Sequence, residues 1–104
     1  MKIPKSFKLF GSTIKVEWDN IRLNDKGRYG EAAYSLAKIS LADTMGLEPL
    51  SEDVIMDTFY HEKVHMILNS MNKDDLSSDE EFVDVFAKLL RQSDSTAVYE
   101  NNDE

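Results

Sequence analysis

The segment from Ser51 to Met71 constrains the fold most, because it carries both a helix start signal and a helical pattern of apolar residues. Ser51 can cap the helix, and Glu52 and Asp53 fall in its first turn, where the helix dipole favours negative charge. Apolar and small residues recur at three- and four-residue steps, which predicts one long helix with a buried face. The residues expected on that face are Val54, Ile55, Thr58, Phe59, His65, Met66 and Leu68.

A second helix is expected after the polar connection at residues 72–78. It begins near Asp79, capped by Ser78 or Asp79, ends near Gln92, and carries many apolar side chains. A chain of 104 residues has room for one domain. We therefore predict a single domain over residues 1–92, followed at residues 93–104 by an acidic tail whose end is mobile.

The N-terminal half of the chain has strand periodicity. Apolar and polar residues alternate over residues 6–18, and a Gly-Ser pair at 11–12 predicts a turn, so this segment is expected to form an antiparallel hairpin. The Asn, Asp and Gly residues at 24–27 predict a loop. Residues 29–42 mix helix-favouring residues with alternation, and we interpret them as extended, because two nearby glycines would weaken a helix start.

The composition excludes several classes of function. Twelve Lys and Arg against twenty Asp and Glu give a net charge of −8, which repels phosphate backbones and anionic lipid heads, so we expect no nucleic-acid or membrane partner. The chain has no cysteine, which excludes disulfides, thiolate zinc sites and a cysteine nucleophile. The chain start lacks the apolar run of a signal peptide, so a cytoplasmic protein is expected.

The only two histidines of the chain, His61 and His65, stand four residues apart in the predicted long helix, with Glu62 between them. Side chains at this spacing lie about 5–6 Å apart on one helix face, so both imidazoles can reach one tetrahedral zinc ion, with Glu62 beside the metal's water. This is the spacing that a metalloprotease needs. The alternative is a pair of partly buried helix histidines that bind no metal.

A zinc site of this kind needs a third protein ligand, which must be a carboxylate in the absence of cysteine or a third histidine. Glu80 and Glu81 in the predicted second helix are the candidates, and they point about 100° apart. Glu80 is preferred because it shares a face with Val83 and Ala87, and Glu81 remains the alternate. Asp84 lies one turn after Glu80 and can accept a hydrogen bond from a zinc-bound imidazole. The alternative role of Glu80 is a first-turn acid that meets the helix dipole.

The runs at residues 58–68 and 80–87 resemble the minimal gluzincin metallopeptidases, especially the small HExxH proteins encoded by phages and prophages. The resemblance covers about residues 51–92. It implies an α+β fold in which a small antiparallel sheet packs on two helices, with HExxH on the first. It also implies Glu62 as general base and three zinc ligands: His61, His65 and a glutamate of the second helix, where the Glu80 to Asp84 spacing fits the family's ExxxD pattern.

The resemblance further implies a zinc-dependent peptidase, in which Glu62 takes a proton from the metal's water and returns it to the leaving amine. The substrate would be a peptide or protein, paired in extended form with an exposed sheet edge, for which we expect the strand near residues 36–41. Larger gluzincins add a C-terminal subdomain that supplies a Tyr or His to the oxyanion. Tyr60 and Tyr99 are the candidates for this role here. The alternative is that Tyr60 is only a half-buried aromatic residue of the helix and Tyr99 only a residue of an unstructured tail.

Protein binding without catalysis is the main alternative function. A small acidic zincin-fold domain with weak or no activity could occupy a basic surface of a partner protein. The net charge of −8 also suggests a mimic of DNA, but solvated acidic faces are common in proteins. Zinc stoichiometry is the most informative measurement, although bound zinc without activity would leave both the peptidase and the binding function open.

Overall fold

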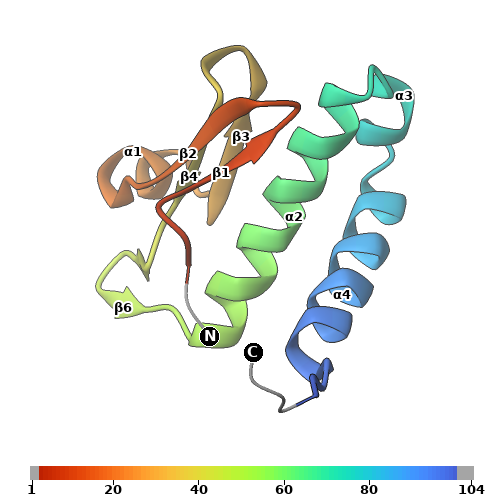
Figure 1. Cartoon of the computed structure of the whole chain (residues 1–104). Helices are drawn as coiled ribbons and strands as arrows, with labels where there is room; N and C mark the ends of the chain where they lie inside the picture. The colour runs from red at the N-terminus through yellow and green to blue at the C-terminus, as the bar shows by residue number, and fades with distance from the viewer. Residues whose placement is uncertain (1–2, 101–104) are drawn as a thin grey trace.

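The computed structural model describes residues 3–100 and has an α+β fold, in which the helix α2 lies between a four-stranded sheet and the helix α4 (Figure 1). The elements in chain order are β1 (Ser6–Leu9), β2 (Ser12–Trp18), α1 (Asn20–Lys26), β3 (Gly30–Ala33), the 3₁₀ turn η1 (Tyr34–Leu36), β4 (Lys38–Leu41), β5 (Thr44–Met45), β6 (Glu48–Pro49), α2 (Glu52–Ser70), α3 (Asp74–Ser77) and α4 (Glu80–Thr96). The α+β class expected from the sequence is confirmed. Within residues 3–100, no helix is both long and apolar enough to cross a bilayer.

The predicted N-terminal hairpin is confirmed, and the sheet that contains it is mixed. Strands β1 and β2 pair antiparallel with Phe7 opposite Ile14, and the turn between them includes Gly11 with a φ of 81°. The strand order is β1-β2-β4-β3, and β2 pairs with β4 in parallel, Val16 opposite Ile39. The prediction of an antiparallel sheet is therefore wrong at this one pairing.

A short helix lies between β2 and β3, where the sequence predicts a loop at residues 24–27. Helix α1 starts after Asp19, whose carboxylate accepts a hydrogen bond from the Arg22 backbone N–H at 3.3 Å. It ends at Gly27, which has the positive φ of 67° typical of a helix C-terminus. Its seven residues are too few to show a helical period in the sequence, which is why the loop prediction fails there.

The segment at 29–42, predicted as extended, contains the hairpin of β3 and β4 joined by η1. In β4, Ile39 and Leu41 are fully buried, whereas β3 is only partly buried. A strand with fully buried apolar side chains favours the sheet centre, so β4 pairs on both sides and β3 forms the edge. The expectation of an exposed edge at residues 36–41 is wrong, because β4 pairs on both sides and the edges of the sheet are β1 and β3.

Helix α2 begins and ends close to the predicted limits. The Ser51 hydroxyl accepts a hydrogen bond from the Val54 N–H at 3.2 Å, as expected for the helix cap. The buried face differs in part from the prediction, because α2 packs against the sheet on one side and α4 on the other. Of the predicted face, Val54, Ile55, Thr58 and His65 are only partly buried; the buried residues are Met56, Phe59, Tyr60, Val64, Met66 and Leu68.

The connection at residues 72–78 contains the short helix α3, and α4 then runs antiparallel to α2 (Figure 1). Helix α4 starts after Asp79, whose carboxylate accepts the Phe82 N–H at 3.1 Å, and it continues to Thr96 instead of ending near Gln92. Asp94 contacts α2, so the domain extends past the predicted boundary at residue 92. Residues 97–100 form no helix or strand and are exposed, and the mobility predicted for the chain end concerns residues 101–104, outside the described part.

Candidate metal centre

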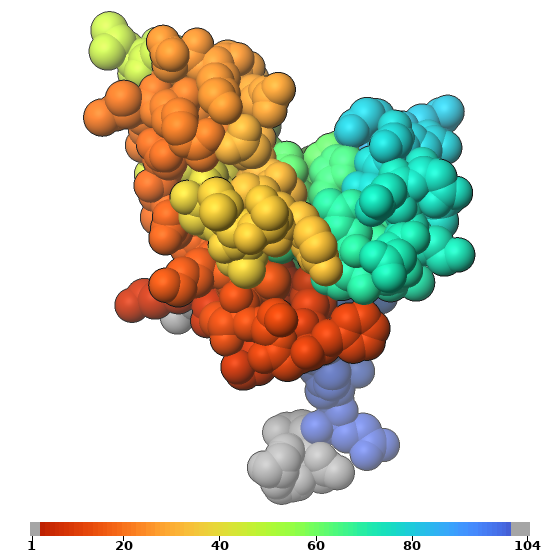
Figure 2. All heavy atoms as spheres, turned by 90° about the horizontal axis from the view of Figure 1, so that it is seen from above, coloured from red at the N-terminus to blue at the C-terminus, as the bar shows by residue number. Residues whose placement is uncertain are grey.

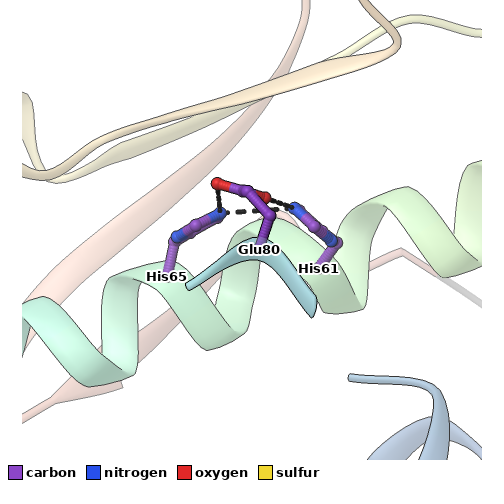
Figure 3. Close-up of side chains that lie close together, drawn as sticks. All are labelled: His61, His65 and Glu80. Carbon is purple, nitrogen blue, oxygen red and sulfur yellow. Dashed lines mark hydrogen bonds and ion pairs between the residues drawn. The ribbon is translucent and has the colours of Figure 1, made fainter. Parts of the chain in front are cut away.

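Glu80 reaches across the two histidines of α2 from the first turn of α4 (Figure 3). The Nε2 atoms of His61 and His65 lie 3.2 Å apart. Glu80 Oε1 lies 3.1 Å from Nε2 of His61, and Oε2 lies 3.5 Å from Nε2 of His65. Tetrahedral zinc with metal–ligand distances of 2.0–2.1 Å separates its ligands by about 3.3 Å. The three side chains thus stand close to the separation that a shared metal ion requires.

The two adjacent glutamates of α4 have different surroundings. Glu80 faces α2, where the helical i and i+4 spacing puts both imidazoles on one face. Glu81 lies on the outer side of α4, where it lines an apolar groove with Phe82 and Phe86. The structure therefore brings the preferred residue, Glu80, to the histidines and leaves the alternate, Glu81, outside.

The second ring nitrogen of each histidine faces a group that can orient it. Nδ1 of His65 lies 2.9 Å from the hydroxyl of Ser77, a residue of α3 that is 9% exposed. Nδ1 of His61 lies 3.8 Å from Asp84 Oδ1, and Asp84 also accepts a hydrogen bond from Lys88 at 3.0 Å. With Nδ1 engaged, Nε2 of His65 is directed to Glu80, which is the arrangement that metal-binding histidines usually have. The sequence prediction includes Asp84 but misses Ser77, because no local signal marks a serine in a polar connection.

Glu62 is a residue of α2, and its side chain is partly buried beside the edge strand β3. Burial raises its pKa to about 7, and the negative charges of Glu80 and Glu31 act in the same direction. The Arg28 charge and a hydrogen bond with the Ala32 backbone oppose this shift. Near neutral pH, a carboxyl group with this pKa both accepts and releases a proton readily.

Burial also affects the protonation of His65. Burial lowers the pKa of His65 from its ordinary value, although the charge of Glu80 partly opposes the shift. Burial therefore favours the neutral imidazole, which is the form that binds a metal ion.

Two hollows flank the site and share Arg28, Gly30, His61 and Glu62 as lining residues. One, of about 380 Å³, extends between β3, α2 and α4, and also meets Tyr29, Val54, Asp57, Thr58, Asp84 and Lys88. The other, of about 360 Å³, contains the histidines and Glu80, and also meets Glu31 and Ala32. Seen from above, the surface is hollowed between the orange segment around α1 and the cyan segment around α3, with green atoms of α2 deeper inside (Figure 2).

Neither tyrosine suggested for the oxyanion lies at the site. The Tyr60 hydroxyl donates a hydrogen bond to Asp94 at 2.7 Å, and burial together with Asp94 raises the Tyr60 pKa to about 12. Tyr60 thus ties α2 to the last turns of α4. Tyr99 follows α4 and is 82% exposed. Neither lines the two hollows beside the histidines.

The donor set of His61, His65 and Glu80 could hold a metal ion. No family model, curated protein or solved structure matches this chain. Two imidazole nitrogens and a carboxylate oxygen are donors that suit zinc and other divalent first-row metals.

Replacement of the two adjacent glutamates of α4 is expected to have unequal effects on metal affinity. Glu80→Ala removes a carboxylate within 3.5 Å of both imidazoles, whereas Glu81→Ala removes an exposed acid from the outer groove. We expect Glu80→Ala to weaken zinc binding far more than Glu81→Ala. Glu81→Ala is the matched control, because the two variants have the same net charge as each other. Competition with a chromogenic chelator measures both affinities. Equal affinities, or the reverse order, would show that Glu80 is not the ligand.

Proposed function

We propose that this protein is a zinc-dependent peptidase in which His61, His65 and Glu80 hold the metal ion and Glu62 moves protons. The observation that carries this proposal is the position of the Glu80 carboxylate, within 3.1 Å and 3.5 Å of the two Nε2 atoms that stand 3.2 Å apart. Three protein ligands of this kind are typical of catalytic zinc sites. A bound zinc ion supplies Lewis acidity, which lowers the pKa of water and polarises a carbonyl group.

Glu62 is the general base of the proposed reaction. It lines both hollows with His61, so a water molecule and a peptide bond can approach it from the same side. Glu62 accepts the proton of the attacking water and delivers it to the leaving amine. Ser77 keeps the His65 ring oriented during these steps.

The edge strand β3 is the proposed binding strand for an extended peptide or protein substrate. It pairs with β4 on one side only, and its residues Gly30 and Ala32 line the hollow that contains the histidines. A Cβ atom at Gly30 would lie 2.5 Å from Thr58 Cγ2 and 3.3 Å from Glu62 Cγ. Glycine therefore lets β3 approach α2 closely, and a peptide added to this edge would run beside Glu62.

A second candidate function is protein binding with weak or no catalysis. The outer face of α4 supports it, because Val85, Phe86 and Leu89 are 53%, 44% and 61% exposed. These side chains line a groove of about 500 Å³ that also meets the acidic residues Asp79 and Glu81. Exposed apolar groups of this kind mark interaction surfaces in many proteins.

Metal content and peptide cleavage together test the proposed function. After metal-replete purification, we expect elemental analysis to find one zinc ion per chain, and none in His61→Ala. A mixed peptide library analysed by mass spectrometry should then show cleavage only with the zinc-loaded protein. Absence of zinc and other divalent metals would refute the metal centre. Bound zinc without cleavage of any peptide would favour the binding function.

A further inference from the structure

Arg28 is a cation beside the site that the proposed reaction does not use. It follows Gly27, the left-handed residue that ends α1, and its backbone N–H donates to the Leu23 carbonyl at 2.9 Å. These contacts hold the Arg28 backbone immediately before the edge strand β3. Arg28 lines both hollows together with His61 and Glu62. The guanidinium is therefore next to the path proposed for the peptide.

The Arg28 guanidinium keeps most of its hydrogen-bonding capacity. Its hydrogen bond within the described chain is a long one, from Nη1 to Glu31 Oε2 at 3.4 Å, and its side chain is 59% exposed. The Glu31 carboxylate is shared with Arg22 at 2.6 Å and Lys26 at 3.3 Å. Arg22 also pairs with Asp19. These ion pairs form a cluster of three cations and two acids, with a net charge of 3 − 2 = +1 in a chain whose net charge is −8. Its members are Arg22, Lys26, Arg28, Asp19 and Glu31.

Two aspartates in the larger hollow have cationic partners of their own. Asp57 pairs with Arg91 at 2.9 Å, and Asp84 pairs with Lys88 at 3.0 Å. The remaining lining includes Tyr29, Val54 and Thr58, together with Glu62 on the side of the histidines. These features form a side-chain-sized space with the free donors of Arg28 at its border, a combination that favours an anionic group with an aliphatic stem.

We propose that Arg28 binds a carboxylate of the substrate, so that the site prefers peptides with a carboxylate next to the bond that is cut. This inference rests on the proposed peptidase function. In an unmodified peptide the carboxylate is the anionic group, and the planar guanidinium matches it with two parallel hydrogen bonds. An Asp or Glu side chain and a free C-terminus supply the same group, and the experiment distinguishes them.

Peptide hydroxamates test this inference without requiring turnover, because the hydroxamate anchors each ligand on zinc. One pair of ligands differs only in Asp against Asn, and a second pair in a free against an amidated C-terminus. Calorimetry on the zinc-loaded protein gives their dissociation constants. We expect the wild type to prefer the carboxylate of at least one pair by about 10- to 100-fold, as for a charge-assisted hydrogen bond, and Arg28→Gln to reduce that ratio to about one.

Lys26→Gln is the matched control for Arg28→Gln. Lys26 contacts the same Glu31 oxygen at 3.3 Å and carries the same charge, but it lines neither hollow. We expect this variant to keep the full carboxylate preference. Arg28→Lys keeps the charge without the planar fork, so it should keep a reduced preference, and it carries the test if Arg28→Gln unfolds. Melting temperature and zinc content are measured for each variant.

The outcomes separate the two proposals. Loss of the Asp preference in Arg28→Gln supports a side-chain carboxylate, and loss of the C-terminal preference supports a terminal one. No preference in the wild type, or equal ratios in wild type and Arg28→Gln, overturns the role of Arg28 while leaving the peptidase intact. Failure of every hydroxamate to bind the zinc-loaded wild type overturns the proposed active site, and the role of Arg28 with it.

Discussion

Glu62→Gln is expected to remove peptide cleavage while leaving zinc and the fold in place. Glutamine keeps the shape of the side chain but has no basic oxygen that can take a proton from water. The zinc ligands of the proposed site are other residues, which stay within 3.5 Å of one another in the structure. Loss of a general base typically costs about 10²- to 10⁴-fold in rate, so residual cleavage should be close to undetectable.

The measurement compares wild type and Glu62→Gln side by side for zinc content, melting temperature and cleavage of the same peptide library. Glu81→Gln is the control, because it makes the same chemical change at an exposed position outside both hollows. The control should cleave like the wild type. Cleavage that survives in Glu62→Gln would exclude the general-base role, even if zinc is present.

In the metal-free protein, the contribution of Glu62 to stability is expected to fall between about pH 5 and pH 8, and Glu62→Gln should remove this pH-dependent contribution. The Glu62 pKa is about 7 in the folded chain against an ordinary 4.5, so the folded state binds the proton more tightly. The stabilising contribution of the Glu62 proton is therefore fully present below the pKa of the unfolded chain, and it is lost as the pH rises through the folded-state pKa of about 7. A difference of about 2.5 pKa units corresponds to about 3 kcal/mol in the free energy of unfolding.

Urea unfolding in the presence of a chelator at pH 5 and pH 8 measures this effect as the difference between the two proteins. The quantity of interest is the free energy of unfolding of Glu62→Gln minus that of the wild type. This difference should shift in favour of Glu62→Gln by up to about 3 kcal/mol between pH 5 and pH 8. Zinc should reduce this advantage, because the positive ion favours the ionised carboxylate. A difference that does not change with pH would mean that the Glu62 pKa is not raised by burial.

Local signals in the sequence were sufficient for the long helices. The Ser51 and Asp79 caps act within three residues, so the helix starts can be recognised without knowledge of the fold. The end of α4 could not be recognised in this way, because its last turns make a contact that is distant in sequence, the hydrogen bond between Asp94 and Tyr60. The parallel pairing of β4 with β2 was missed for a similar reason, since strand order depends on burial of the whole strand.

For the candidate site, the sequence by itself determined the pair of His61 and His65, because a four-residue helical spacing puts both rings on one face. It also favoured Glu80 over Glu81, since the two lie on different faces of their helix. Only the tertiary structure decided which groups surround these residues. Ser77 reaches His65 through the turn of α3, and β3 comes beside Glu62 through its position at the sheet edge. These contacts join segments that are separate in the chain, so their positions depend on packing and not on local sequence pattern.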